Sequence, residues 1–182
     1  MTPAQEFKKL LESCQDTLDW SGSMHKFLRE MIEALDKLKL VSDQKKQKRI
    51  YREAYRDFRY ALRSARLINR SYGKAKGALE ILKPLVGVEL QKQMEAIEQR
   101  LKPAEAAVLA ESSCFRGRLN DDLNALEARI VTNRLTPRDV DACTRKVREL
   151  LAEDRRSVGL VPFMIEVRNL QQLLEGLKRK VA

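Results

Sequence analysis

Apolar residues recur every three or four positions along much of the chain. The period is clear over residues 7–18 and again over residues 24–38, and it is the spacing at which one face of an α-helix repeats. A Ser-Gly-Ser segment at 21–23 separates the two stretches, and such a cluster is typical of a turn. The pattern therefore predicts two amphipathic helices, the first ending near residue 20.

Capping residues predict where helices begin. Thr2 and Pro3, with Gln5 three positions after Thr2, predict a capping box at the first helix. Ser42 is expected to cap a long helix that starts near Asp43 and continues to about residue 70. The Ser-Tyr-Gly segment at 71–73 is expected to weaken or kink that helix.

Prolines predict the boundaries in the second half. A helix that follows Gly87 is expected to end at Lys102, because the residue before a proline disfavours helical geometry. Thr136 and Pro137 predict a later helix start, and the last helix is expected to begin near Pro162. Its apolar stripe, spaced alternately by four and three residues, consists of Phe163, Val167, Leu170, Leu174, Leu177 and Val181. This stripe could pack within a bundle or form an oligomer through the C-terminal helix.

These elements predict an all-α fold: an antiparallel bundle of about seven helices with short connections, possibly elongated. Hydrophobic residues make up 43% of the 182 positions, and only seven glycines and five prolines occur. One helical domain over residues 1–182 is expected, since the length suits a single core. The basic segment 43–83 lies within it.

The composition also indicates where the protein works. No stretch reaches the roughly 20 apolar residues of a membrane-spanning helix, and residues 1–11 lack a signal core, which predicts a cytoplasmic protein with no membrane partner. Cys14, Cys114 and Cys143 are odd in number and lie in apolar stripes. They are expected to be reduced and buried rather than disulfide-bonded.

Positive charge is concentrated in one segment. The chain has 36 basic and 26 acidic residues, a net charge of +10, and such an excess attracts nucleic acid, other polyanions or acidic proteins. Segment 43–83 holds thirteen basic and four acidic residues, which gives 13 − 4 = +9. The rest of the chain is therefore almost neutral.

The basic residues of this segment are phased along one helical face. Eight of them, separated alternately by four and three positions, form what we call the arginine row: Lys45, Arg49, Arg52, Arg56, Arg59, Arg63, Arg66 and Arg70. At ~1.5 Å per residue the row spans roughly 37 Å. Like charges at this spacing cost about 0.2–0.5 kcal/mol per pair in a helix, so an anionic partner would stabilise the row.

That partner could be internal or external. Glu53 can reach Arg49 and Arg56, but the four arginines from Arg59 onward have no acidic residue three or four positions away. Acidic residues of other helices could neutralise the row if they pack alongside it; the candidates are Glu30, Glu33, Asp36, Glu95 and Glu98. Arginine also binds phosphate through two parallel hydrogen bonds. The sequence therefore favours an external polyanion and internal neutralisation equally.

The tyrosines favour nucleic acid among the polyanions. All four fall within or just beyond the basic helix, at Tyr51, Tyr55, Tyr60 and Tyr72. Single-strand binders combine phosphate contacts with aromatic stacking on bases. Tyr51 and Tyr55 are expected at the edge of the core, which leaves Tyr60 and Tyr72 as the candidates for stacking.

One family resemblance concerns the same helix. The residues that resemble the first half of CHAD domains are Met24, His25 and the segment to Val41, then Tyr51, Arg52, Arg56, Phe58, Arg59 and Arg63. That family is helical and binds polyphosphate, so the resemblance implies phosphate contacts at the four arginines. It covers about a quarter of the chain. The basic run that the family has after the histidine is absent, and Lys26, Phe27 and Leu28 stand there.

The sequence thus predicts a non-enzymatic binding module with no cofactor and no metal. His25 is the only histidine, which argues against a histidine-dominated zinc site, and phosphate-binding glycine loops are absent. The arginine row is expected to bind a linear polyanion, RNA or single-stranded DNA first. The alternatives are an interaction or assembly module, such as an adaptor, chaperone or small subunit, that docks an acidic protein, and a polyphosphate binder.

Overall fold

The computed structural model describes the backbone of residues 2–153 and 157–181, and the side chains of these residues apart from 110–116, 180 and 181. All regular structure in these residues is helical. The helices are α1 (Pro3–Lys39), α2 (Gln44–Leu82), α3 (Val88–Glu105), α4 (Glu111–Val131), α5 (Pro137–Leu151) and α6 (Leu160–Val181). The prediction of an all-α bundle is confirmed, with six α-helices in place of about seven.

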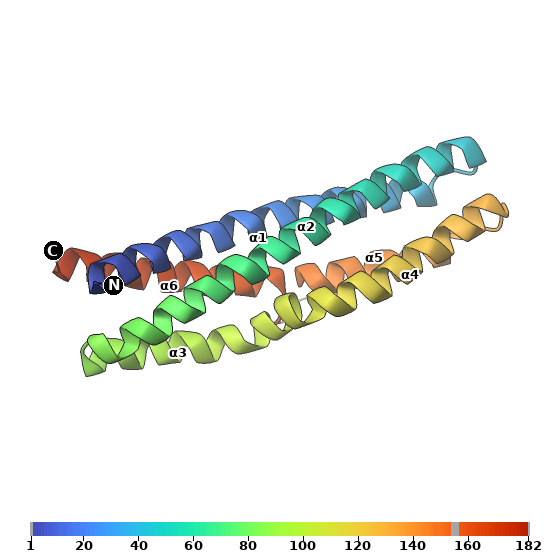
Figure 1. Cartoon of the computed structure of the whole chain (residues 1–182). Coiled ribbons are helices and arrows are strands. Elements are labelled where there is room, and N and C mark those ends of the chain that lie inside the picture. The colour runs from blue at the N-terminus through green and yellow to red at the C-terminus, as the bar shows by residue number, and fades with distance from the viewer. Residues whose placement is uncertain (1, 154–156, 182) are drawn as a thin grey trace.

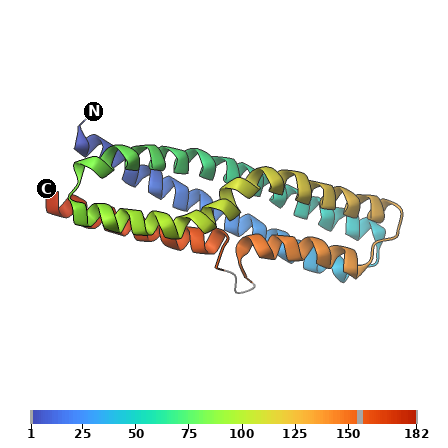
Figure 2. The ribbon, with the colours of Figure 1, turned by 90° about the horizontal axis from the view of Figure 1, so that it is seen from below.

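The six helices form four antiparallel rods (Figure 1). α1 and α2 are long single rods, α3 and α4 together make a third, and α5 and α6 follow one another along the fourth (Figure 2). α2 packs against α1 and α4, whereas α6 packs against α1 and α3. The rod of α5 and α6 is therefore diagonal to α2 across the bundle.

Three predicted helix ends are wrong. The long helix expected to end near residue 70 continues as α2 through Ser71, Tyr72 and Gly73 to Leu82. The Ser-Gly-Ser segment lies inside α1, where Ser21 is fully buried, because packing of a 37-residue helix against α2 outweighs the weak helix propensity of these residues. Pro103 likewise lies inside α3. The chain continues from there through a π-helical segment, Ala106–Ala110, directly into α4.

The core is continuous along the bundle, and the apolar stripe of the last helix belongs to it. Phe163, Val167, Leu170 and Leu174 are buried, while Val181 lies outside the described side chains. Of the two alternatives predicted for this stripe, the structure shows packing within the bundle. None of the described helices is long and apolar enough to cross a membrane.

Two of the three cysteines are buried free thiols, as expected. Cys14 and Cys143 are each 1% exposed, and burial raises the pKa of both to about 12. Such thiols are protonated and inert near neutral pH. Cys114 lies outside the described side chains.

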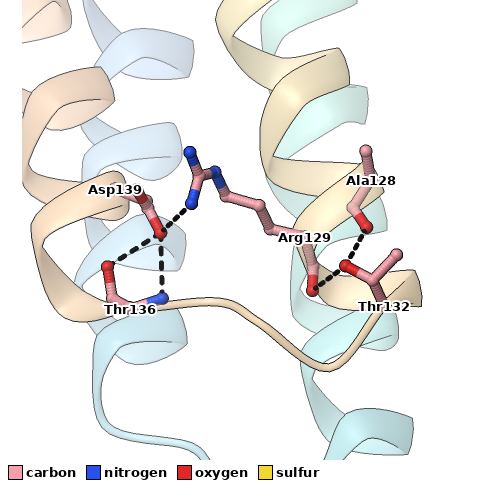
Figure 3. Close-up of polar contacts among 5 residues, drawn as sticks. All are labelled: Ala128, Arg129, Thr132, Thr136 and Asp139. Carbon is pink, nitrogen blue, oxygen red and sulfur yellow. Dashed lines mark hydrogen bonds and ion pairs between the residues drawn. The ribbon is translucent and has the colours of Figure 1, made fainter.

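The start of α5 shows how local sequence fixes the connection from α4 (Figure 3). The Thr136 backbone N–H and Oγ1 both donate to Asp139 Oδ2, at 3.0 and 2.8 Å. Arg129 of α4 donates to the same oxygen at 3.3 Å. The predicted helix start at Thr136 is confirmed. The Asp139 carboxylate that completes the cap also ties α5 to α4.

This cap predicts a pH-dependent contribution to stability. Burial would raise the pKa of Asp139, but hydrogen bonds from Thr136 and the charge of Arg129 outweigh it and hold the pKa below 3.8. A lowered pKa in the folded state stabilises the protein above the unfolded-state pKa, and this contribution is lost as the pH falls through the folded-state value. We expect Asp139→Asn to cost about 0.5–1 kcal/mol at pH 7, with the difference from wild type shrinking below pH 3.8. Urea unfolding at several pH values measures it, and a pH-independent difference would contradict the assignment.

Candidate functional site

The arginine row lies on the solvent side of α2. The apolar stripe of that helix faces the core, with Ala54, Phe58, Ala61 and Ala65 all nearly inaccessible. All eight members of the row are exposed. A 39-residue helix held on both flanks keeps the row straight and extended.

Only one residue of the row forms an ion pair within the described part of the chain. The single ion pair there is a 3.8 Å contact from Arg56 Nε to Asp57 Oδ1, between adjacent residues. Glu53, expected to reach two arginines, forms no ion pair with either. Most of the row is therefore exposed to solvent without a carboxylate partner among the described residues.

The acidic residues considered as internal partners lie elsewhere. Glu98 pairs with Lys83 at 2.6 Å, and Asp36 pairs with Arg148 at 3.5 Å. Among the described residues, Glu30, Glu33 and Glu95 form no ion pair with the row either. Arg59, Arg63, Arg66 and Arg70, which decide between internal and external neutralisation, thus have no carboxylate partner among those residues.

Asp57 is the one buried acidic residue of α2, which is described over its whole length. It is 4% exposed, and burial raises its pKa; Arg56 opposes that rise, while the charges of Glu30 and Glu53 add to it. A carboxylate with a raised pKa loses its negative charge at a higher pH than an ordinary carboxylate does. The positive potential along α2 is therefore kept or increased as the pH falls.

A groove of 1310 Å³ lies between α2 and α4, which run side by side (Figures 1 and 2). Two hydrogen bonds set the antiparallel register of its walls. Tyr51 Oη donates to the Leu123 carbonyl at 2.8 Å, and Gln44 Nε2 donates to the Ile130 carbonyl at 2.9 Å. The floor includes the buried rings of Tyr51 and Phe58.

The groove is strongly cationic. Its α2 wall carries six basic side chains: Lys48, Arg52, Arg56, Arg59, Arg63 and Arg66. Five of these belong to the arginine row, and Lys48 was missed because it falls outside the phased spacing. Lys45, Arg49 and Arg70 are exposed on α2 beyond the groove lining.

The α4 wall was not found from the sequence. Asn120, Asn124, Glu127 and Val131 line it at helical spacing, and Glu127 is the one carboxylate among the described residues of this wall. Among the described side chains Glu127 forms no ion pair, although its charge contributes to the raised pKa of Tyr51. Only the register of α4 against α2 brings these residues opposite the row.

The two tyrosines expected to stack differ sharply in position. Tyr60 is 44% exposed, lines the groove and packs its ring against Phe27 with centroids 5.0 Å apart. Tyr72 is 6% exposed, donates to Glu105 Oε2 at 3.4 Å and packs edge-on against Phe163. The stacking role predicted for Tyr72 is therefore wrong, because its ring is part of the core.

No family model, curated protein or solved structure matches the chain. The partial resemblance to CHAD domains therefore receives no support from other proteins. In the described part of the chain, His, Cys, Asp and Glu side chains do not gather in groups that could hold a metal ion. His25, half-buried in the middle of α1, accepts a hydrogen bond from Arg29 at 3.3 Å. The geometry of α2 and α4 is the remaining guide to function.

Proposed function

We propose that the protein is a non-enzymatic binding module that holds a single-stranded nucleic acid along the α2–α4 groove. The observation that supports this most directly is the arginine row, because seven of its eight cations have no carboxylate partner among the described residues. Like charges at this spacing repel. A row held straight and exposed gains stability when an external anion neutralises it.

The shape of the site favours a linear ligand. A row of roughly 37 Å at ~1.5 Å per residue presents a cation every turn of helix, and arginine forks bind phosphate oxygens bidentately. A polymer with a regularly repeated charge satisfies such a row better than a compact anion does. Among the described residues that line the groove, Tyr60 is the one aromatic ring exposed to solvent, and such a ring suits base stacking.

Binding to a labelled single-stranded oligonucleotide tests the proposal. The protein is purified in high salt with nuclease treatment, and fluorescence anisotropy is then followed as protein is added. Saturable binding that weakens steeply with salt is expected, because cations released from phosphates drive it. A stoichiometric acidic protein partner, with nucleic acid held no better than by any basic protein, would contradict the proposal.

Tyr60→Ala is expected to weaken oligonucleotide binding by about 5- to 150-fold, which corresponds to ~1–3 kcal/mol for one stacked base. Tyr60→Phe keeps the ring and its contact with Phe27, so it serves as the matched control and should bind like wild type. Anisotropy titrations measure both variants. Equal affinities for the alanine and phenylalanine variants would show that the ring does not stack.

A further inference from the structure

The two walls of the α2–α4 groove differ in chemistry. The α2 wall carries six cations. The α4 wall carries two amides and one carboxylate, at Asn120, Asn124 and Glu127, and no described cation. A ligand in this groove therefore meets fixed positive charge on α2 and, among the described residues of α4 that line it, hydrogen-bonding side chains without positive charge.

The two kinds of polar residue on the α4 wall differ in hydrogen-bonding capacity. An asparagine amide both donates and accepts, whereas an ionised glutamate only accepts. The side chains recur at spacings of four and three, so they project along one face of α4. The hydrogen bonds from Tyr51 to Leu123 and from Gln44 to Ile130 place Asn120 level with about residue 54 of α2 and Glu127 level with about residue 47.

Glu127 restricts where a phosphate can lie. A carboxylate repels phosphate and attracts N–H donors, and Glu127 forms no ion pair with a described residue that would mask its charge. Phosphates are therefore favoured beside α2, and neutral donors are favoured beside α4. A polymer that is anionic along one edge and carries amino groups along the other matches both walls.

We infer that the groove orients a single strand, with phosphates on the arginines of α2 and base edges on Asn120, Asn124 and Glu127, and that Glu127 selects bases with an exocyclic amino group. This inference rests on the proposed function. Inorganic polyphosphate matches only the α2 wall, because it is anionic on every side. Glutamate accepts a hydrogen bond from cytosine N4, where uracil presents a carbonyl oxygen.

Oligonucleotides that differ only in their bases test the inference. Homopolymers of deoxycytidine, deoxyuridine and an abasic backbone, each of roughly 12 nucleotides, fall within the site sizes common for single-strand binders. Wild type is expected to bind the cytidine strand about five-fold tighter than the uridine strand. The abasic strand should bind more weakly than both.

The Glu127→Gln variant distinguishes two roles for Glu127: accepting hydrogen bonds from base amino groups, and simply repelling phosphate. If Glu127 accepts from amino groups, the variant loses affinity for the cytidine strand and gains affinity for the uridine and abasic strands. If it only repels phosphate, all three strands gain equally. Asp121→Asn is the matched control, since it removes one negative charge from the exposed surface of α4 outside the groove, and it should leave the ratio between strands unchanged.

The Asn120→Ala and Asn124→Ala double variant provides a second readout. It should weaken the cytidine and uridine strands several-fold and leave the abasic strand unchanged. Equal binding of all three strands by wild type, by Glu127→Gln and by the asparagine double variant would overturn the inference while the proposed function stands. No saturable binding of any strand would instead remove the proposed function itself.

Discussion

Changing Arg56, Arg59 and Arg63 to glutamate is expected to weaken single-strand binding by at least about 100-fold. Each lost contact is a charge-assisted hydrogen bond worth roughly 1.5–3 kcal/mol, and about 1.4 kcal/mol is a tenfold change in affinity. The three side chains lie in the middle of the groove. The new carboxylates also repel phosphate, so the loss should exceed that of alanine variants.

A matched variant separates this local effect from net charge. Arg138, Arg145 and Arg168 are exposed arginines of α5 and α6, the rod diagonal to α2. Changing these three to glutamate alters the net charge equally, yet it should weaken binding less than about tenfold, since the contacts to phosphate remain. Circular dichroism should show the same helicity for both variants. Equal losses of affinity would mean that overall charge, and not the row, attracts the ligand.

Phe163→Ala is expected to have the largest effect on folding. The Phe163 ring is fully buried and packs edge-on against Tyr72, with centroids 5.3 Å apart. Removing a buried phenylalanine ring costs about 3–5 kcal/mol, because transfer energy is lost and a cavity is left. Urea unfolding should show this loss as a lower midpoint at an unchanged slope.

Ile165→Ala is the control for that experiment. Ile165 lies two residues along α6 and is 48% exposed, so its truncation should cost less than about 1 kcal/mol. A small effect for Phe163→Ala, comparable to that of Ile165→Ala, would mean that the Phe163 ring is not packed in the core against Tyr72.

Helical periodicity was sufficient to predict the fold class, and cap chemistry was sufficient to predict the start of α5 at Thr136. It was not sufficient to predict where long helices continue. Ser21 and Pro103 lie inside helices, because contacts with distant segments outweigh a local cost of about 1–3 kcal/mol. Contacts between residues far apart in the sequence cannot be read from a local pattern.

One part of the candidate site could likewise be predicted from the sequence, and the other part could not. The arginine row was visible because every member lies on one helix, whereas the α4 wall depends on the register of two helices, which no local pattern specifies. The buried position of Tyr72 could have been predicted from the sequence. Tyr72 falls four residues after Ile68 and three before Ala75, on the apolar stripe of α2, whereas Tyr60 falls outside that stripe.

The salt dependence of oligonucleotide binding is the most direct test of polyanion binding by the arginine row. The six basic side chains of the groove predict a slope of log K against log salt near −4, at about 0.7 per phosphate on a single strand. Neutralising Arg56, Arg59 and Arg63 to alanine should reduce the slope by about 2. Binding that is undetectable, or a slope that is near zero or unchanged in the alanine variant, would contradict the account.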